Sequence, residues 1–241
     1  TGDFVALYTA SSCVVQTPNT RVRCETSPGV GTGHSWRLQV GETQLVEAVQ
    51  TTTTSYAPPT LETVGLAGGA RSPTTGGAMF ELGGTGFGPA GEATPTVRYG
   101  PGGTPSAQWY VASQCVVVSD DLIRCAMTAG VGQGHRAIVE GIGGQSSGVS
   151  AAPSDETSLG NTLSYLQPVI LEHRGEASDG AQTAGGQSIT IDGANFGPHD
   201  ASAPPTVFAK GAYGREVHAS GCAIDADSPH TRVVCNSTGA G

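Results

Sequence analysis

The chain has 241 residues and a net charge of −9, with 37 glycines, 15 prolines and only 5% aromatic residues. This composition favours many turns and modest cores over long helices. No basic cluster is present to neutralise phosphates, so nucleic acid is not an expected partner. No segment approaches the roughly 20 apolar residues that span a membrane.

A short device occurs three times along the chain. Two cysteines enclose a hairpin-length segment, and a ladder of alternating glycines follows, ending in a histidine in the first two copies. The first cysteines lie at positions 13, 115 and 222, so the period is 102 and then 107 residues. A repeat of this length indicates tandem domains. The cysteine pairs are Cys13/Cys24, Cys115/Cys125 and Cys222/Cys235.

The repeat predicts how the cysteines pair. Six cysteines allow many pairings, but each pair lies within its own copy, so we expect each to close on itself. Zinc binding is the competing interpretation, and zinc sites use cysteines closer together than these. Disulfides form in oxidising compartments, so an extracellular or cell-surface location is expected.

Short alternating runs bounded by glycines predict strands, taken in chain order. One strand should enter each second cysteine, and another should follow each of the first two glycine ladders, at residues 35–40 and 136–142. The runs "MFEL" (79–82) and "SITI" (188–191) predict strands in equivalent positions of two copies. No stretch shows a sustained helical period. Many short strands with glycine and proline between them favour an antiparallel sandwich.

The order of motifs resembles the IPT/TIG domain, an immunoglobulin-like sandwich of extracellular proteins. "SYAPP" (55–59) answers to "SYLQP" (164–168), and "TTGGAMFELGGTGFGP" (74–89) answers to "TAGGQSITIDGANFGP" (183–198). The cysteine hairpin and a G-x-G-H ladder follow. Fibrocystin-type proteins and repeat-rich surface proteins of algae and protists are similar in style. The resemblance implies an all-β fold of tandem sandwiches, about 100 residues per repeat, and supplies no catalytic, cofactor-binding or metal-binding residues.

This resemblance divides the chain into three parts. Residues 1–57 form the C-terminal part of one repeat, 58–167 a complete repeat, and 168–241 the N-terminal part of another. Strand donation between the two end pieces is conceivable. However, both pieces contain the cysteine hairpin, about thirty residues in duplicate. A window of a longer array explains the overlap more simply.

The glycines of each ladder permit positive φ and close backbone approach. His34 and His135, which end the ladders, are expected to hydrogen-bond the glycine turn. Metal binding would need convergent ligands, and one histidine per repeat supplies none.

Three further motifs contain residue types that could carry chemistry. "GQSSG" (144–148) matches a serine nucleophile motif, which requires a strand–turn–helix context that is not expected here. "SDD" (119–121) and "DADS" (225–228) are acidic turns with too few ligands for calcium. No enzyme activity, cofactor or metal is therefore expected.

Two features concern glycans. Asn236 lies in the sequon "NST" beside a cysteine and should be exposed. A hydroxyl-rich run precedes the first proline pair and is either an O-glycosylated stalk or an ordinary edge strand. Its residues are Thr51, Thr52, Thr53, Thr54 and Ser55.

The sequence therefore predicts a non-enzymatic extracellular structural protein, a subunit of a glycosylated surface appendage or fibre. The alternative is an ectodomain segment of a receptor or adhesin. Self-association into a filament is expected, because tandem sandwiches make rods and open strand edges pair with other chains. The segment 150–162, which lengthens the second junction, is expected at or near an inter-subunit or inter-domain contact.

Overall fold

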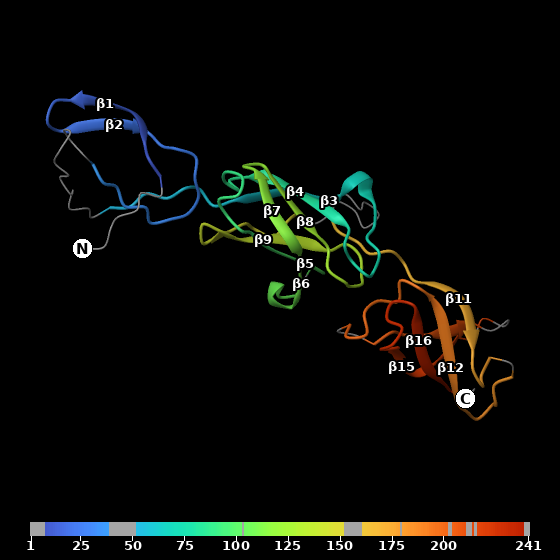
Figure 1. Ribbon diagram of the computed structural model, residues 1–241. Helices are drawn as coiled ribbons and strands as arrows, with labels where there is room; N and C mark the ends of the chain where they lie inside the picture. Colours follow the sequence, from blue (N-terminus) through green and yellow to red (C-terminus); the bar gives the residue numbers. More distant parts are fainter. Residues whose placement is uncertain are drawn as a thin grey trace.

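The computed structural model describes residues 8–38, 52–102, 104–151, 161–178, 180–201, 204–210, 214 and 216–238. Three groups of strands follow one another between the N and C labels of Figure 1. We call them the first unit (residues up to Tyr56), the central unit (from there to Tyr165) and the third unit (the remainder). Each is built from antiparallel pairs.

The central unit contains two four-stranded sheets with the orders β3-β4-β8-β7 and β10-β9-β5-β6. Two short 3₁₀ turns, η1 (Ala67–Gly69) and η2 (Ser106–Gln108), join its strands. The strands of the first sheet are β3 (Thr60–Leu66), β4 (Met79–Thr85), β7 (Ser113–Ser119) and β8 (Leu122–Ala126). Those of the second are β5 (Thr96–Gly100), β6 (Tyr110–Val111), β9 (Arg136–Ile142) and β10 (Gln145–Ser146).

The core of the central unit lies between these two sheets. Alternate residues of each strand point inward, as the period of two requires. Phe80 and Leu82 of β4 are fully buried, and so are Val97 of β5 and Val139 of β9. One continuous apolar cluster contains residues of both sheets. This makes the central unit a sandwich.

The third unit repeats one of these sheets and only part of the other. The order β11-β12-β16-β15 matches β3-β4-β8-β7, whereas β13 and β14 form a separate two-stranded sheet. The described residues contain no counterpart of β9, and the buried cluster is small. The strands are β11 (Val169–Arg174), β12 (Gly185–Ala194), β13 (Phe208–Lys210), β14 (Glu216–His218), β15 (Ser220–Ile224) and β16 (Arg232–Thr238).

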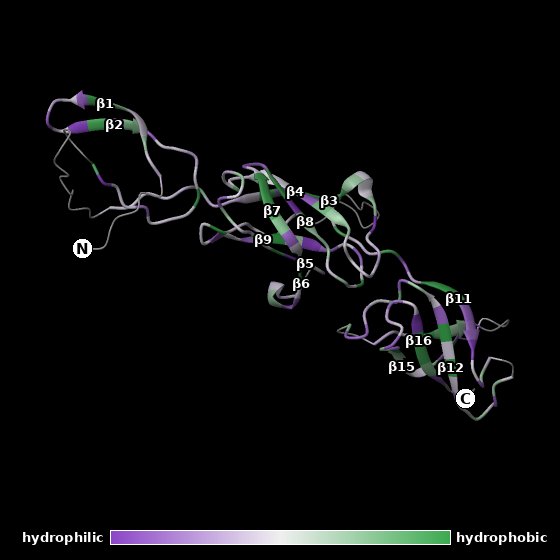
Figure 2. Cartoon of the chain, in the orientation of Figure 1, coloured by the Kyte–Doolittle hydropathy of each residue, from purple (hydrophilic) through white to green (hydrophobic). Residues whose placement is uncertain are grey.

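The first unit consists of one hairpin, β1 (Ser11–Thr17) and β2 (Arg21–Glu25), followed by the glycine ladder. Val15 and Val22 are 66% and 42% exposed. Their counterparts in the central unit are 5% and 0% exposed because a second sheet covers them: Val117 and Ile123. Figure 2 shows the hydrophobic residues of β2 in green.

The prediction of a strand at residues 35–40 is wrong for the part that the structure describes. Residues 35–38 belong to no strand, and residues 39 and 40 lie outside the described residues. In the central unit the equivalent strand, β9, pairs with β5 along five residues. The described part of the first unit has no counterpart of β5, so the ladder of hydrogen bonds that would define a strand does not form.

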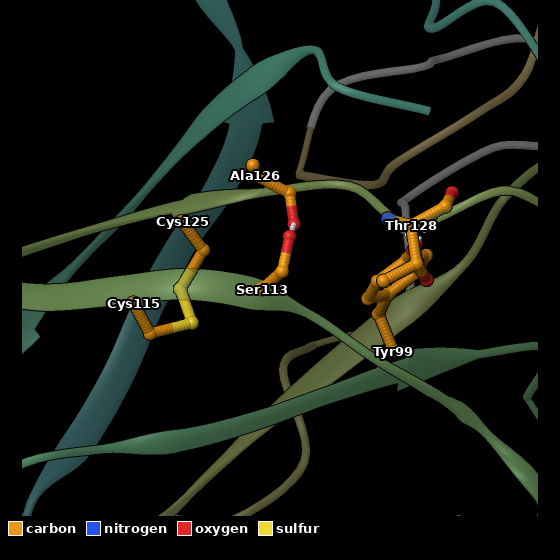
Figure 3. The surroundings of a disulfide bond; sticks show 6 residues. All are labelled: Tyr99, Ser113, Cys115, Cys125, Ala126 and Thr128. Carbon is orange, nitrogen blue, oxygen red and sulfur yellow. Dashed lines mark hydrogen bonds between the residues drawn. A yellow bond between two sulfur atoms is a disulfide. The ribbon is translucent and has the colours of Figure 1, made fainter. Parts of the chain in front are cut away.

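Disulfides join Cys13 to Cys24, Cys115 to Cys125 and Cys222 to Cys235, the pairs that the repeat predicts. Each bond ties the two strands of one hairpin together, and Figure 3 shows the central one. Beside it, Ser113 Oγ donates a hydrogen bond to the carbonyl oxygen of Ala126 on the partner strand. The disulfides thus hold the hairpins independently of the sandwich around them.

The predicted fold class, all-β with antiparallel sheets consistent with tandem immunoglobulin-like sandwiches, is confirmed. The repeat length and the domain ranges 1–57, 58–167 and 168–241 stay predictions. No helix among the described residues is long and apolar enough to cross a membrane.

Replacing Cys115 and Cys125 by serine should lower the free energy of unfolding of the central unit by about 3 kcal/mol, because the hairpin loses its cross-link. Thermal unfolding monitored by circular dichroism measures this, with Val116→Ala, an exposed change on the same strand, as control.

Peptide mapping without reduction should recover the three pairs. Crossed pairs or free thiols would contradict the assignment.

Candidate functional site

The two junctions between units are built in the same way around a single valine. Val30 lies in the middle of the first glycine ladder and Val131 in the middle of the second. Val30 is 8% exposed and belongs to the core cluster of the next unit. We call these two side chains the valine knobs. Each projects from the end of one unit into the beginning of the following one.

Each knob meets a glycine of the next unit, in the motif G-x-F-G-P. A Cβ atom on Gly88 would collide with Cγ1 of Val30, and a Cβ atom on Gly197 with Cγ1 of Val131. Both glycines have positive φ, +83° and +100°. Glycine is therefore required twice over, by the left-handed backbone and by the space that the knob occupies.

The loop that receives the first knob is fixed by Asp120 at the tip of the β7–β8 hairpin. Its carboxylate accepts hydrogen bonds from the amides of Gly88 and Gly86, at 3.0 and 3.4 Å. Its carbonyl oxygen also accepts one from the Phe87 amide. In the third unit the carbonyl oxygen of His230 accepts the equivalent bond from Phe196. The acidic tip "SDD" thus orders the receiving loop.

Three aromatic side chains cluster beside the backbone of each knob valine, and we call them the aromatic cage. The first cage consists of Tyr8, His34 and Tyr56, with ring centroids 5.3–5.5 Å apart. All three pairs meet edge to face, the arrangement that ring quadrupoles favour. The second cage has the same arrangement with centroids 5.7–5.9 Å apart: Tyr110, His135 and Tyr165.

The cage holds the backbone of the knob through hydrogen bonds. The Tyr8 hydroxyl accepts from the Val30 amide at 2.9 Å and donates to the Val30 carbonyl oxygen at 3.1 Å. His34 Nε2 lies 3.1 Å from the same oxygen. The second cage repeats all three contacts at Val131. Both polar groups of each valine are thereby satisfied, which a partly buried turn requires.

The ladder glycines have two different tasks. Gly31 and Gly132 have φ of +102° and +106°, so they need a residue without a Cβ atom. Gly29 is instead required for space, because a Cβ atom there would lie 2.5 Å from the Tyr8 ring. The expected role of His34 and His135, binding the glycine turn, is what their contacts to the ladder valines provide.

Burial changes the acid–base properties of the second cage. Desolvation lowers the pKa of His135, which is 3% exposed. Its Nε2 faces the Val131 carbonyl oxygen, while its buried Nδ1 has no hydrogen-bond partner. A proton added at Nδ1 would therefore be unpaired. Burial and the hydrogen bond with Tyr99 raise the pKa of Tyr165. Both shifts favour the neutral forms of these two side chains.

Polar contacts also cross the junctions. At the first, the side-chain amide of Gln145 donates to the carbonyl oxygen of Tyr56 at 3.2 Å. At the second, His230 Nδ1 lies 3.0 Å from the Thr74 hydroxyl. Each unit therefore contacts its neighbour through an apolar knob and at least one hydrogen bond.

Asn236 lies on β16 and its side chain is exposed, as a glycan acceptor must be. In the hydroxyl-rich run, Thr51 lies outside the described residues, and Thr52 and Thr53 are exposed. Thr54 Oγ1 accepts a hydrogen bond from the Trp36 indole, and Ser55 Oγ accepts one from the Gly33 amide. The Ser55 hydroxyl thus binds the ladder, and the Thr54 hydroxyl binds a residue that follows the ladder. Of the segment 150–162, residues 152–160 lie outside the described residues.

The remaining motifs have structural contacts. Ser147 of "GQSSG" is buried, accepts from the Val139 amide and donates to the Gly148 carbonyl oxygen. Asp225 of "DADS" accepts from the amides of Asp227 and Ser228, which closes a turn. Within the described ranges, no three His, Cys, Asp or Glu side chains gather to hold a metal ion.

The residues predicted to form sites do not include the knob valines or the cage tyrosines, although Tyr56 and Tyr165 lie in the repeated motifs "SYAPP" and "SYLQP". A signal for the tyrosines existed, because Tyr8 and Tyr110 each lie five positions before the first cysteine of their copy. The knobs also share a position, six residues after the second cysteine. Only the fold shows that these residues meet the next unit.

No family model and no curated protein matches the chain. Among solved structures, the extracellular region of plexin A4 is similar, with a TM-score of 0.30 and 15% identity. The match covers 78% of this chain and spans only 13% of the plexin chain. A similarity this low carries no argument about function. The fold therefore rests on the sheets and core described above, and IPT/TIG stays a resemblance of sequence.

The stability of the central unit should fall as the pH drops below about 6.5, the ordinary pKa of histidine. Below that pH the unfolded chain binds a proton at His135, whereas the folded unit resists it because its pKa is lowered. The variant His135→Gln should weaken this dependence, measured as unfolding midpoints between pH 7.5 and 5, and His173→Gln, an exposed change, should not. An NMR titration placing the pKa of His135 at or above 6.5 would refute the assignment.

Truncating a knob should loosen the junction without unfolding the units. Val131→Ala removes the methyl groups of a half-buried side chain that lies against Gly197 and should weaken the contact with the third unit by about 1 kcal/mol. Small-angle X-ray scattering should then show a broader distribution of distances between the units than the wild type does. The exposed Val116→Ala is the matched control. Identical scattering curves for Val131→Ala and the wild type would contradict a role of the knob.

Proposed function

We propose that this chain is a non-enzymatic extracellular structural protein and a subunit of a fibre or surface appendage. The observation that carries the proposal is the repetition of one junction. Knob, receiving glycine and aromatic cage recur at both unit boundaries with matching hydrogen bonds. A junction that repeats imposes a similar relation on successive units, which is the physical basis of a rod.

The disulfides and exposed glycan acceptors of the chain suit an extracellular setting. Three disulfides cross-link hairpins whose units have few aromatic residues and, in the third unit, a small core. Such bonds persist in oxidising compartments and compensate for limited burial. The exposed Asn236 would carry an N-linked glycan in that setting, and the exposed Thr52 and Thr53 are open to O-linked sugars.

The alternative is a segment of a receptor or adhesin ectodomain, in which the same rod would separate a ligand-binding region from the membrane. The complete gene product distinguishes the two: a transmembrane helix with a cytosolic domain favours the receptor, and repeats alone favour the fibre. A catalytic domain elsewhere would instead make these units accessories of an enzyme.

Electron microscopy of native material is the direct test of the fibre. We expect filaments whose density contains successive sandwiches, and a mass decrease of the Asn236 peptide on enzymatic deglycosylation. Isolated particles at high protein concentration, with an unmodified Asn236 peptide, would refute the glycosylated fibre.

A further inference from the structure

The chain enters and leaves the central unit along two neighbouring segments. The entry segment comprises residues 60–72 and contains β3, and the exit segment comprises residues 161–166 and leads to the third unit. In Figure 1 the first unit lies on one side of the central unit and the third unit on the other. A pull on the two ends of the chain therefore draws the entry and exit segments in opposite directions.

Three hydrogen bonds join these two segments directly, and we call them the clamp. The Val64 amide donates to Oδ1 of Asn161 at 2.6 Å. The Ser72 amide donates to the Ser164 carbonyl oxygen at 2.9 Å, and the Leu166 amide donates to the Ser72 carbonyl oxygen at 2.7 Å. The backbone bridge at Ser72 is parallel. The two segments thus run side by side in the same direction.

The parallel direction decides how the clamp meets a load. When two parallel segments are pulled from opposite ends, one slides along the other, and the bonds between them lie across the line of pull. Such bonds share the load and must break together, whereas the bonds of a hairpin pulled at its open end break one at a time. The rate of forced unfolding is set by the barrier to opening, and here that barrier contains all three bonds.

Burial protects the clamp and anchors the segments that it joins. Ser72 has no exposed surface, so water does not replace the hydrogen bonds of its amide and carbonyl groups one by one. Leu163 and Tyr165 of the exit segment are buried and belong to the core cluster. The entry segment pairs with β4 at six positions. Sliding of either segment therefore also disturbs the core or the first sheet.

We propose that the central unit bears tension along the chain and that the clamp is the structure that resists it. All the residues of the clamp lie within the central unit and the residue that follows it, so the clamp needs no contribution from the first or third unit. A unit that bears tension suits a fibre and an ectodomain alike. This function therefore goes beyond the proposed one and does not depend on it.

The test is to stretch the 241-residue chain between optical tweezers, with handles attached at its two ends. The opening of the central unit is identified with the variant Cys115→Ser/Cys125→Ser, in which its gain in length should increase by about 30 Å. The increase arises because the disulfide bridges a separation of 10 residues, which then extend with the rest of the unit.

Two variants remove one bond of the clamp each. Asn161→Gly removes the oxygen that binds the Val64 amide, and glycine tolerates the φ of +66° at this position. Leu166→Pro removes the amide that binds Ser72. Each should raise the rate of opening at a given force about fivefold, which is the effect of one hydrogen bond on the barrier. Asn161→Asp keeps an acceptor oxygen and should open like the wild type.

Thr104→Ala is the matched control, because it also removes one hydrogen bond, from the Trp109 indole, but lies outside both segments. It should lower the stability against urea as Asn161→Gly does, with the rate of opening under force unchanged. Circular dichroism checks that every variant is folded. Equal rates for the wild type, Asn161→Gly and Leu166→Pro would overturn the clamp, and so would an equal acceleration by Thr104→Ala. Neither result bears on the fibre, which electron microscopy of native material tests.

Discussion

The junctions between units depend on the hydrogen bonds between each aromatic cage and the backbone of its knob valine. A glycine ladder is by itself the most freely moving segment of a chain, because glycine loses more conformational freedom on ordering than any other residue. The tyrosine and histidine of the cage give the valine amide and carbonyl their partners. The ladder is thereby fixed in one conformation, and the valine side chain can only point toward the next unit.

A hairpin within the receiving unit also contributes to the junction with the preceding unit. Asp120 lies at a hairpin tip, far in sequence from the glycines whose amides it binds, and those glycines receive a knob from the preceding unit. The β7–β8 hairpin and the first junction are therefore connected. A shift of the hairpin would move the receiving glycines through Asp120, and a shift of the cage would move the knob valine that packs against them.

The three units differ more in the burial of their hairpins than in the sequences of those hairpins. The same type of hairpin is covered in the central unit and exposed in the first, where Val15 is 66% exposed against 5% for Val117. A sandwich needs two sheets to bury its inner faces, and a hairpin alone is at best marginally stable. The disulfides cross-link the end hairpins as well, although the apolar face of the first hairpin is exposed.

The sequence by itself determined the repeat, the cysteine pairing, the strands into each second cysteine and the all-β class. These features follow from local rules: alternation, glycine and proline turns, and spacing within one copy. It also predicted that His34 and His135 bind the glycine turn. Only the tertiary structure decided that residues 35–38 form no strand, because a strand needs a partner from elsewhere in the chain. It likewise decided that Tyr8, Val30 and Gly88 meet, since two of these belong to one unit and the third to the next. Period and composition describe what a segment prefers, whereas a junction depends on which distant segment occupies the space beside it.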